Sequence, residues 1–272
     1  MKARVIVAAV GLPVLVLAII FLPAWVLGFI AGGAGVCCAW ELLRCTQEGA
    51  SPRISAYASV IAFCIPFLSV FYNREIVVVG LLFLLFALLF AELLLSFRRS
   101  ETLELGAVTD GLLAGGVLPI LLTGVVRMRL RDAGVACALL PFVVAFATDA
   151  GAYFVGISLG RHKLTPRLSP NKTVEGSVGG FAGAIVITLI YGVVLRALHL
   201  NVRFAVLGVC GFLGSLAAQL GDLSFSAIKR LYKVKDYGNL LPGHGGMLDR
   251  MDSLLWVIPL LELVTAWVPA IY

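Results

Sequence analysis

Apolar runs long enough to cross a lipid bilayer recur along the whole of this 272-residue sequence. A membrane-spanning helix needs about 20 consecutive apolar residues. The runs predict about nine spans, at 5–22, 24–43, 54–72, 76–97, 106–126, 134–158, 176–198, 203–225 and 253–271. Hydrophobic residues make up 61% of the chain and charged residues only 13%, whereas soluble domains carry about 25% charged residues. We therefore expect an all-α, polytopic integral membrane protein.

The sequence predicts two regions. Residues 1–133 hold about five spans, and residues 134–272 hold about four spans with two long polar loops, 161–175 and 226–252. The first apolar run is long for a cleavable signal peptide and lacks an A-x-A-like end, so we interpret it as retained. No polar stretch is long enough to bury a core of its own. The six cysteines show no metal-type spacing and are expected to be small core residues.

The basic residues indicate how the chain is oriented. With the N-terminus inside, most of the 21 Lys and Arg residues fall on the inner face, as the positive-inside rule requires. The loops 161–175 and 226–252 are separated by two spans and therefore share a face. We expect a multi-pass protein of the cytoplasmic (inner) cell membrane, with its functional site on the cytoplasmic side.

The eighth predicted span carries polar residues at helical spacing. Steps of three or four residues place them on one helix face: Ser215, Gln219, Asp222, Ser226, Lys229 and Lys233. A stripe that only hydrogen-bonds to neighbouring helices is the alternative. Asp222 argues against that alternative, because a carboxylate in the membrane needs a cation or a proton. Asp149 in the sixth span raises the same question.

The loop 161–175 is basic and rich in hydroxyl groups, and it leads directly into the seventh span. Helix N-termini flanked by Lys and by Ser or Thr favour phosphate. The candidates for contact with a substrate are Lys163, Ser169, Lys172 and Thr173. A basic loop that merely follows the topology rule is the alternative interpretation.

Residues 226–252 gather charge around a glycine-rich turn. The charged residues are Lys229, Arg230, Lys233, Lys235, Asp236, Asp249, Arg250 and Asp252, and the turn is Leu241-Pro242-Gly243-His244-Gly245-Gly246. Such a turn returns the second acidic group toward the first helix, so Asp222 and Asp249 would face each other. Paired carboxylates suit Mg²⁺, which completes its shell with phosphate and water. The pattern indicates metal-assisted phosphoryl or nucleotidyl transfer.

The segment reads Ser226-Ala-Ile-Lys229-Arg230-x4-Lys235-Asp236-x-Gly238-x2-Leu241-Pro242-x-His244-Gly245-Gly246-Met-Leu-Asp249-Arg250-Met-Asp252. This run resembles the signature of the phosphatidate cytidylyltransferases (CDP-diacylglycerol synthases), and it fills every fixed position of that signature. The stretch from Asp149 to Gly180 is also similar to the family, so the resemblance covers about the last 125 residues. The first five spans agree only in being hydrophobic.

The resemblance implies a nucleotidyltransferase that condenses CTP with phosphatidic acid to CDP-diacylglycerol and pyrophosphate. It implies a homodimer in the lipid bilayer that uses Mg²⁺, with K⁺ as a further cation, and no nucleic-acid partner. The metal ligands would be Asp222 and Asp249. The implied catalytic residues are Asp222, Lys229, Arg230, Lys235, Asp236, His244, Asp249, Arg250 and Asp252. The implied substrate-binding residues are Asp149, Lys163, Ser169, Lys172, Thr173, Ser226, Gly245 and Gly246.

One position departs from the family. Phe225 stands where relatives often carry an acidic residue, three positions after Asp222, so this chain has no acidic side chain at that position. Two other functions stay open. A CTP-dependent lipid-alcohol kinase would transfer the γ-phosphate and release CDP. An ion-coupled transporter would use Asp110, Asp149 and Asp222 as an ion path.

Overall fold

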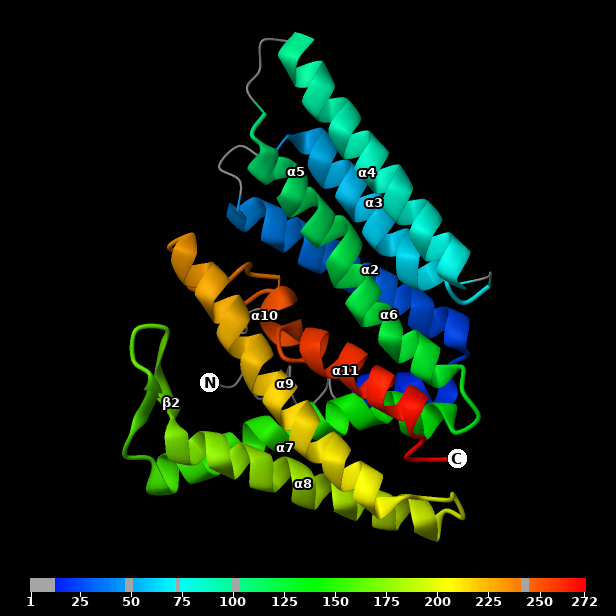
Figure 1. Ribbon diagram of the computed structural model, residues 1–272, viewed down its shortest axis with the longest axis vertical. Coiled ribbons are helices and arrows are strands. Elements are labelled where there is room, and N and C mark those ends of the chain that lie inside the picture. Colours follow the sequence, from blue (N-terminus) through cyan, green and yellow to red (C-terminus); the bar gives the residue numbers. More distant parts are fainter. Residues whose placement is uncertain (1–12, 47–50, 72–73, 99–102, 241–244) are drawn as a thin grey trace. The chain divides into compact units, whose positions relative to one another are not determined.

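The computed structural model describes residues 13–46, 51–71, 74–98, 103–240 and 245–272, which are helical over most of their length (Figure 1). Residues 13–21 are helical. The further helices are α2 (Ala24–Thr46), α3 (Pro52–Leu68), α4 (Arg74–Arg98), α5 (Leu105–Leu112), the π-helix η1 (Leu113–Val117), α6 (Leu118–Arg129), α7 (Gly134–Leu159), α8 (Val174–Ala197), α9 (Phe204–Leu231), α10 (Leu248–Met251) and α11 (Leu254–Trp267). The strands β1 (Lys163–Thr165) and β2 (Ser169–Thr173) form one hairpin.

The prediction of an all-α, polytopic membrane protein is confirmed. Among the described residues, 6 helical stretches are long and apolar enough to cross a membrane: α2, α4, the continuous stretch from α5 to α6, α7, α8 and α9. The predicted spans 54–72 and 253–271 correspond to the shorter helices α3, of 17 residues, and α11, of 14 residues. Much of the first predicted span lies outside the described residues. The structure therefore does not confirm the count of nine.

The chain folds into two compact units, each built from two separate segments. Unit 1 comprises Met1–Val126 and Tyr232–Arg250, and unit 2 comprises Arg127–Leu231 and Met251–Tyr272. Most of the loop 226–252 therefore belongs with the N-terminal helices, whereas the loop 161–175 belongs to unit 2. The division of the sequence at residue 133 stays a prediction.

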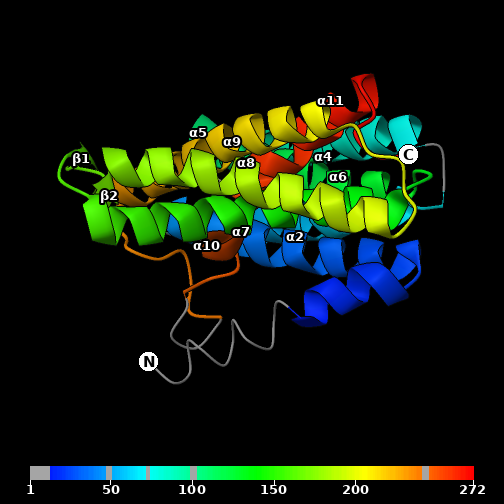
Figure 2. The same ribbon diagram turned by 90° about the horizontal axis from the view of Figure 1, so that it is seen from below.

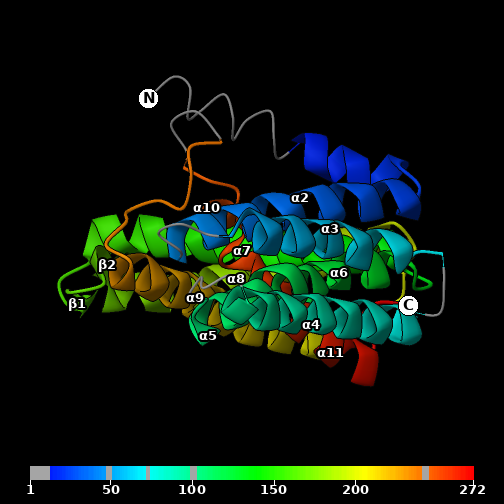
Figure 3. The same ribbon diagram turned by 90° about the horizontal axis from the view of Figure 1, so that it is seen from above.

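Small residues let the helices of unit 1 pack closely. α2 contacts α3, and α3 contacts α4 and η1; α2 and α3 lie side by side in Figure 3. A Cβ atom at Gly32 of α2 would lie 2.8 Å from the carbonyl oxygen of Phe63 in α3, so only glycine permits this approach. By contrast, α4 exposes large apolar side chains such as Phe83 and Phe97, a surface suited to lipid.

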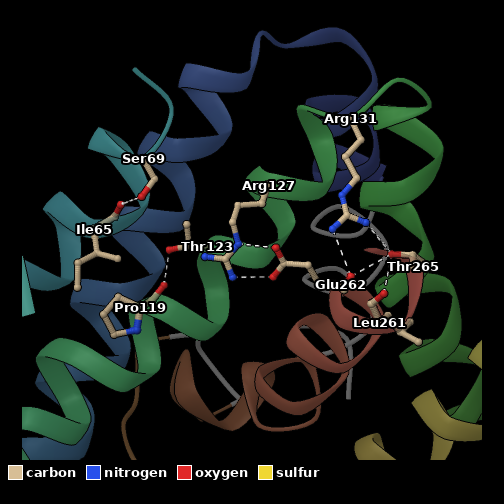
Figure 4. A network of polar contacts seen from close by, with 9 residues as sticks. All are labelled: Ile65, Ser69, Pro119, Thr123, Arg127, Arg131, Leu261, Glu262 and Thr265. Atoms are coloured by element: carbon tan, nitrogen blue, oxygen red, sulfur yellow. Dashed lines mark hydrogen bonds and ion pairs between the residues drawn. The ribbon is translucent and has the colours of Figure 1, made fainter. Parts of the chain in front are cut away.

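Unit 2 is organised around the paired helices α7 and α8, which lie side by side in Figures 1 and 2. Gly151 of α7 faces Gly179 of α8 so closely that a Cβ atom at Gly151 would collide with the carbonyl group of Gly179. α9 packs on both helices and on α11. α11 is held further by Glu262, which accepts hydrogen bonds from Nε and Nη2 of Arg127 (Figure 4).

The loop 161–175 contains the β1–β2 hairpin, which the sequence did not predict. The strands are antiparallel, with Lys163 opposite Thr173 and Thr165 opposite Ser169. Glu175 closes the base of the hairpin. Its carboxylate accepts hydrogen bonds from the backbone N–H of Arg161 (3.0 Å) and His162 (3.2 Å) and pairs with His162 Nδ1 at 2.6 Å. The hairpin is thereby fixed to the first turn of α8.

Candidate active site

Unit 2 contains a cavity of about 590 Å³ where α7, the hairpin, α8 and α9 meet. Polar side chains from all four elements line it: Asp149, Lys163, Ser169, Asn171, Lys172, Thr173, Ser177, Gln219 and Asp222. Apolar groups of Tyr153, Ile157 and Leu223 complete the wall. The structure therefore brings together six of the predicted site residues, from Asp149 to Asp222.

Asp222 is the anionic centre of this cavity. Lys172 Nζ from β2 lies 2.5 Å from its Oδ2 atom, and Ser226 Oγ donates a hydrogen bond of 3.3 Å to its Oδ1 atom. Ser226 lies one helical turn beyond Asp222, so the predicted polar stripe is confirmed at this point. The carboxylate in the membrane helix thus has the cationic partner that a charge in such a helix requires.

Gln219 continues the stripe one turn deeper and joins α9 to α8. Ser177 Oγ donates to Gln219 Oε1, and Gln219 Nε2 donates to the backbone oxygen of Ser177 and to Ser215 Oγ, both at 3.3 Å. Sequence reasoning missed Ser177 and Asn171 as cavity residues. A hydroxyl residue that follows Glu175 and Gly176, at the start of an apolar helix, was the available signal for Ser177.

Thr173 has a structural role that the sequence did not indicate. Its Oγ1 atom accepts a hydrogen bond of 3.1 Å from Gly176 N–H and so caps α8. Gly160 makes room for it, because a Cβ atom there would lie 2.9 Å from Thr173 Oγ1. Contact between Thr173 and a substrate stays a prediction.

Two carboxylates of the cavity, Asp149 and Asp222, act on a third carboxylate, that of Asp252. The pKa of Asp252, at the junction of α10 and α11, is raised to about 7, first by burial and then by the negative charge of Asp222. Asp149 raises the pKa further, whereas Ser253 N–H and Lys229 lower it. Gly221 lets this chain segment cross α9 beside Asp222, since a Cβ atom there would lie 2.6 Å from the backbone oxygen of Asp252. A cation would relieve the repulsion between these acids.

The donor set restricts what such a cation can be. Across the described ranges, no three His, Cys, Asp or Glu side chains converge into a ligand group. One or two carboxylates are a poor site for Zn²⁺, which takes several nitrogen or sulfur ligands. They fit Mg²⁺, which keeps waters and takes further oxygens from substrate phosphates.

In unit 1, Asp249 organises the loop that carries it. Its Oδ2 atom accepts hydrogen bonds from Tyr237 N–H (2.8 Å) and Gly246 N–H (2.9 Å), and the residue is buried. Gly245 adopts a φ of +79° in this loop, a conformation that favours glycine. Asp222 and Asp249 belong to different units, so their expected pairing stays a prediction.

The remaining predicted residues are distributed as follows. Arg230 Nε points to the hairpin, with a hydrogen bond of 3.5 Å to the Leu168 carbonyl oxygen. Lys229 lies close enough to Asp252 to lower its pKa. Lys235, Asp236 and Arg250 are exposed in unit 1. His244 lies outside the described residues.

The chain is similar to known cytidylyltransferases. It is 52% identical to the phosphatidate cytidylyltransferase of Bacillus subtilis over 124 residues, which are 46% of this chain and 45% of that protein. It is 44% identical to the Staphylococcus saprophyticus protein of the same name over 134 residues, 49% of this chain and 50% of that one. These alignments span about half the length of the curated relatives. The sequence model of the cytidylyltransferase family matches residues 2–268, nearly the whole chain, and the protein therefore belongs to the cytidylyltransferase family.

Proposed function

We propose that the protein transfers CMP from CTP to phosphatidic acid, giving CDP-diacylglycerol and pyrophosphate. The observation that carries this proposal is the ion pair of Lys172 and Asp222 inside a polar cavity of about 590 Å³. A cavity in a membrane helix bundle that holds both a metal-binding acid and phosphate-binding cations suits the joining of a nucleotide to a lipid phosphate. The names of the relatives support the same reaction.

The chain's own residues would act by position and charge. An anionic oxygen of phosphatidate forms a bond to the α-phosphorus of CTP, and the bond from that phosphorus to the bridging oxygen of the β-phosphate breaks. Pyrophosphate leaves with the electron pair. The attacking oxygen is already ionised, so neither a protein nucleophile nor a general base is required. Lys163, Lys172 and Arg230 would stabilise the charge that moves onto the departing pyrophosphate.

Mg²⁺ is the proposed cofactor. Asp222 and Asp249 would hold it, and when bound it would neutralise phosphate charge and orient the two substrates. The negative charges of Asp222 and Asp149, which help to raise the pKa of Asp252, support a divalent cation beside Asp222. K⁺ is proposed only from the family resemblance, and no residue is assigned to it.

We further propose the cytoplasmic membrane as the site of action, with the cavity open to the cytoplasmic side. The six apolar helices and the bacterial relatives support a multi-pass protein of the cell membrane. The orientation rests on the basic loops 161–175 and 226–252. A homodimer and the substrates CTP and phosphatidic acid complete the proposal.

The test is product analysis with purified protein in phosphatidate-containing micelles. CTP labelled at the α-phosphorus should transfer label to lipid only with Mg²⁺, with one pyrophosphate released per lipid formed, and EDTA should stop the reaction. Asp222→Asn should reduce turnover at least about a thousandfold, whereas Glu92→Gln, a carboxyl change outside the cavity, should not. Release of CDP would instead indicate the lipid-alcohol kinase. Liposome ion flux that needs Asp222 but no nucleotide would indicate the transporter.

A further inference from the structure

Glu41 is a buried carboxylate in the membrane helix α2 of unit 1. Its Oε1 atom accepts a hydrogen bond of 2.9 Å from Met247 N–H, and its Oε2 atom accepts one of 2.8 Å from Leu248 N–H. In the described part of the chain, no Lys, Arg or His side chain contacts this carboxylate. Its charge is therefore stabilised by backbone groups about 200 residues away in the sequence.

Two glycines of the signature segment fit around Glu41. A Cβ atom at Gly238 would lie 2.6 Å from Glu41 Oε1, and one at Gly246 would collide with Oε2. Neither distance can be accommodated by a buried carboxylate held at both oxygens. The absence of side chains at 238 and 246 therefore lets the backbone lie directly against Glu41. Sequence reasoning had assigned Gly246 to substrate approach, but its N–H is bound by Asp249 in this structure.

The segment that Glu41 holds is the one that presents Asp249. Asp249 binds the N–H groups of Tyr237 and Gly246, while Glu41 binds those of Met247 and Leu248. Three consecutive amides, from Gly246 to Leu248, are thus fixed by two carboxylates. These hydrogen bonds hold the backbone that leads into Asp249.

We propose that Glu41 is a positioning residue for the transfer reaction, holding the segment 245–249 so that Asp249 is presented in one orientation. This inference rests on the proposed function, in which Asp249 binds the metal. Two N–H groups point at the two oxygens of Glu41, and a carboxylate accepts at both. A glutamine offers one oxygen and one NH₂ group, and the NH₂ group would oppose one of the two donors. An aspartate keeps two acceptors on a shorter side chain.

The experiment compares Glu41→Gln, Glu41→Asp and the control Glu92→Gln in the full-length protein purified in detergent. Glu92 is also a buried carboxylate of unit 1, but its ion pair is with the side chain of Arg53, at 3.1 Å. The first readout is hydrogen–deuterium exchange of peptides covering 245–251. The second is kcat together with the Mg²⁺ concentration that gives half-maximal activity.

We expect Glu41→Gln to accelerate amide exchange at 246–248. It should lower kcat or raise the Mg²⁺ requirement by roughly 10- to 100-fold, as for partners that orient metal ligands. Glu41→Asp should recover part of both effects, and Glu92→Gln should leave exchange of 245–251 unchanged. A Glu41→Gln protein with normal exchange and kcat within about twofold of wild type would overturn the inference.

A purely structural role gives a different pattern. Exchange would then rise throughout α2 and α3, and the surviving active protein would keep the wild-type Mg²⁺ requirement, which would also overturn the inference. Failure of the proposed function is distinguishable from both outcomes. In that case wild type makes no CDP-diacylglycerol, whereas exchange still reports whether Glu41 holds the segment.

Discussion

Lys172 Nζ lies 2.5 Å from Asp222 Oδ2, which joins the β1–β2 hairpin to the polar face of α9. The two side chains remain 27% and 33% exposed, so a ligand in the cavity can reach both. An anionic phosphate would compete with Asp222 for the ammonium group, and a metal ion would compete with Lys172 for the carboxylate. Binding of substrate and metal should therefore break this ion pair and form two new ones, between Lys172 and phosphate and between Asp222 and the metal ion.

Lys172→Met tests that exchange. We expect kcat/KM for CDP-diacylglycerol formation to fall roughly 100-fold, because one charge that stabilises the reacting phosphates is lost. The melting temperature should change little, since a partly exposed ion pair contributes only about 0–1 kcal/mol. Arg196→Gln, which removes an exposed cation at the other end of α8, is the control and should keep wild-type kinetics. Equal losses in both variants would show a general effect of surface charge.

The raised pKa of Asp252 predicts a pH-dependent stability in protein freed of metal with EDTA. Its pKa is about 7 in the folded chain against 3.8 for the free group, so the folded state binds the proton more tightly. The resulting stabilisation is complete below about pH 4 and is lost as the pH rises through 7.

The asparagine side chain of the Asp252→Asn variant cannot ionise. At pH 8 the free energy of unfolding of this variant should therefore exceed that of wild type by up to about 4 kcal/mol, and its melting temperature should be higher. At pH 4 the two proteins should melt at similar temperatures. Thermal melts at both pH values check this. A gain of the same size at both would mean that the substitution acts through packing and not through charge.

The ion pair between Arg127 and Glu262 should stabilise unit 2. Its side chains are 25% and 13% exposed, and Arg131 reinforces it through Thr265 Oγ1 (2.8 Å) and the Glu262 carbonyl oxygen (3.2 Å) (Figure 4). Glu262→Gln leaves the guanidinium group facing a neutral amide and should cost about 2–3 kcal/mol. His162→Ala, which breaks an exposed pair, should cost under about 1 kcal/mol. Similar losses for both, measured by thermal unfolding, would contradict the assignment.

The close approach of α7 and α8 predicts sensitivity to a single methyl group. Gly151→Ala would drive its Cβ atom into the carbonyl group of Gly179, and backbone cannot move aside as a flexible side chain can. We expect a loss of about 1–3 kcal/mol in stability and reduced activity, because both helices line the cavity. Gly80→Ala is the matched control, since a Cβ atom there meets nothing within 4 Å. A stable, active Gly151→Ala protein would show that the helices can separate.

Helical periodicity explains what could be predicted from the sequence. Long apolar runs gave the positions of the main helices, and the three- and four-residue steps of the stripe placed Gln219, Asp222 and Ser226 on one face. Those predictions need only local geometry. Part of the cavity lining could also be predicted, because Lys172 lies in the basic, hydroxyl-rich loop 161–175 and Asp222 lies in the polar stripe.

Interactions between distant segments could not be predicted. Glu41 lies alone in an apolar run, and nothing nearby shows that the amides of Met247 and Leu248 will bind it. The hairpin strands have 3 and 5 residues, too few for an alternating pattern. Thr173 is a third case, because a hydroxyl oxygen before a helix suits either a phosphate site or a helix cap, and the two differ only in the three-dimensional structure.

The hydrogen bonds that Glu175 accepts at the base of the hairpin make its tip a suitable place for a reporter group. These bonds fix the base of the hairpin, and the ion pair of Lys172 with Asp222 joins β2 to α9. The tip residues Pro166 and Arg167 are exposed, beyond these anchors. A cysteine at Arg167 could therefore carry a fluorophore close to the cavity, and a change in its emission would follow nucleotide arrival in real time.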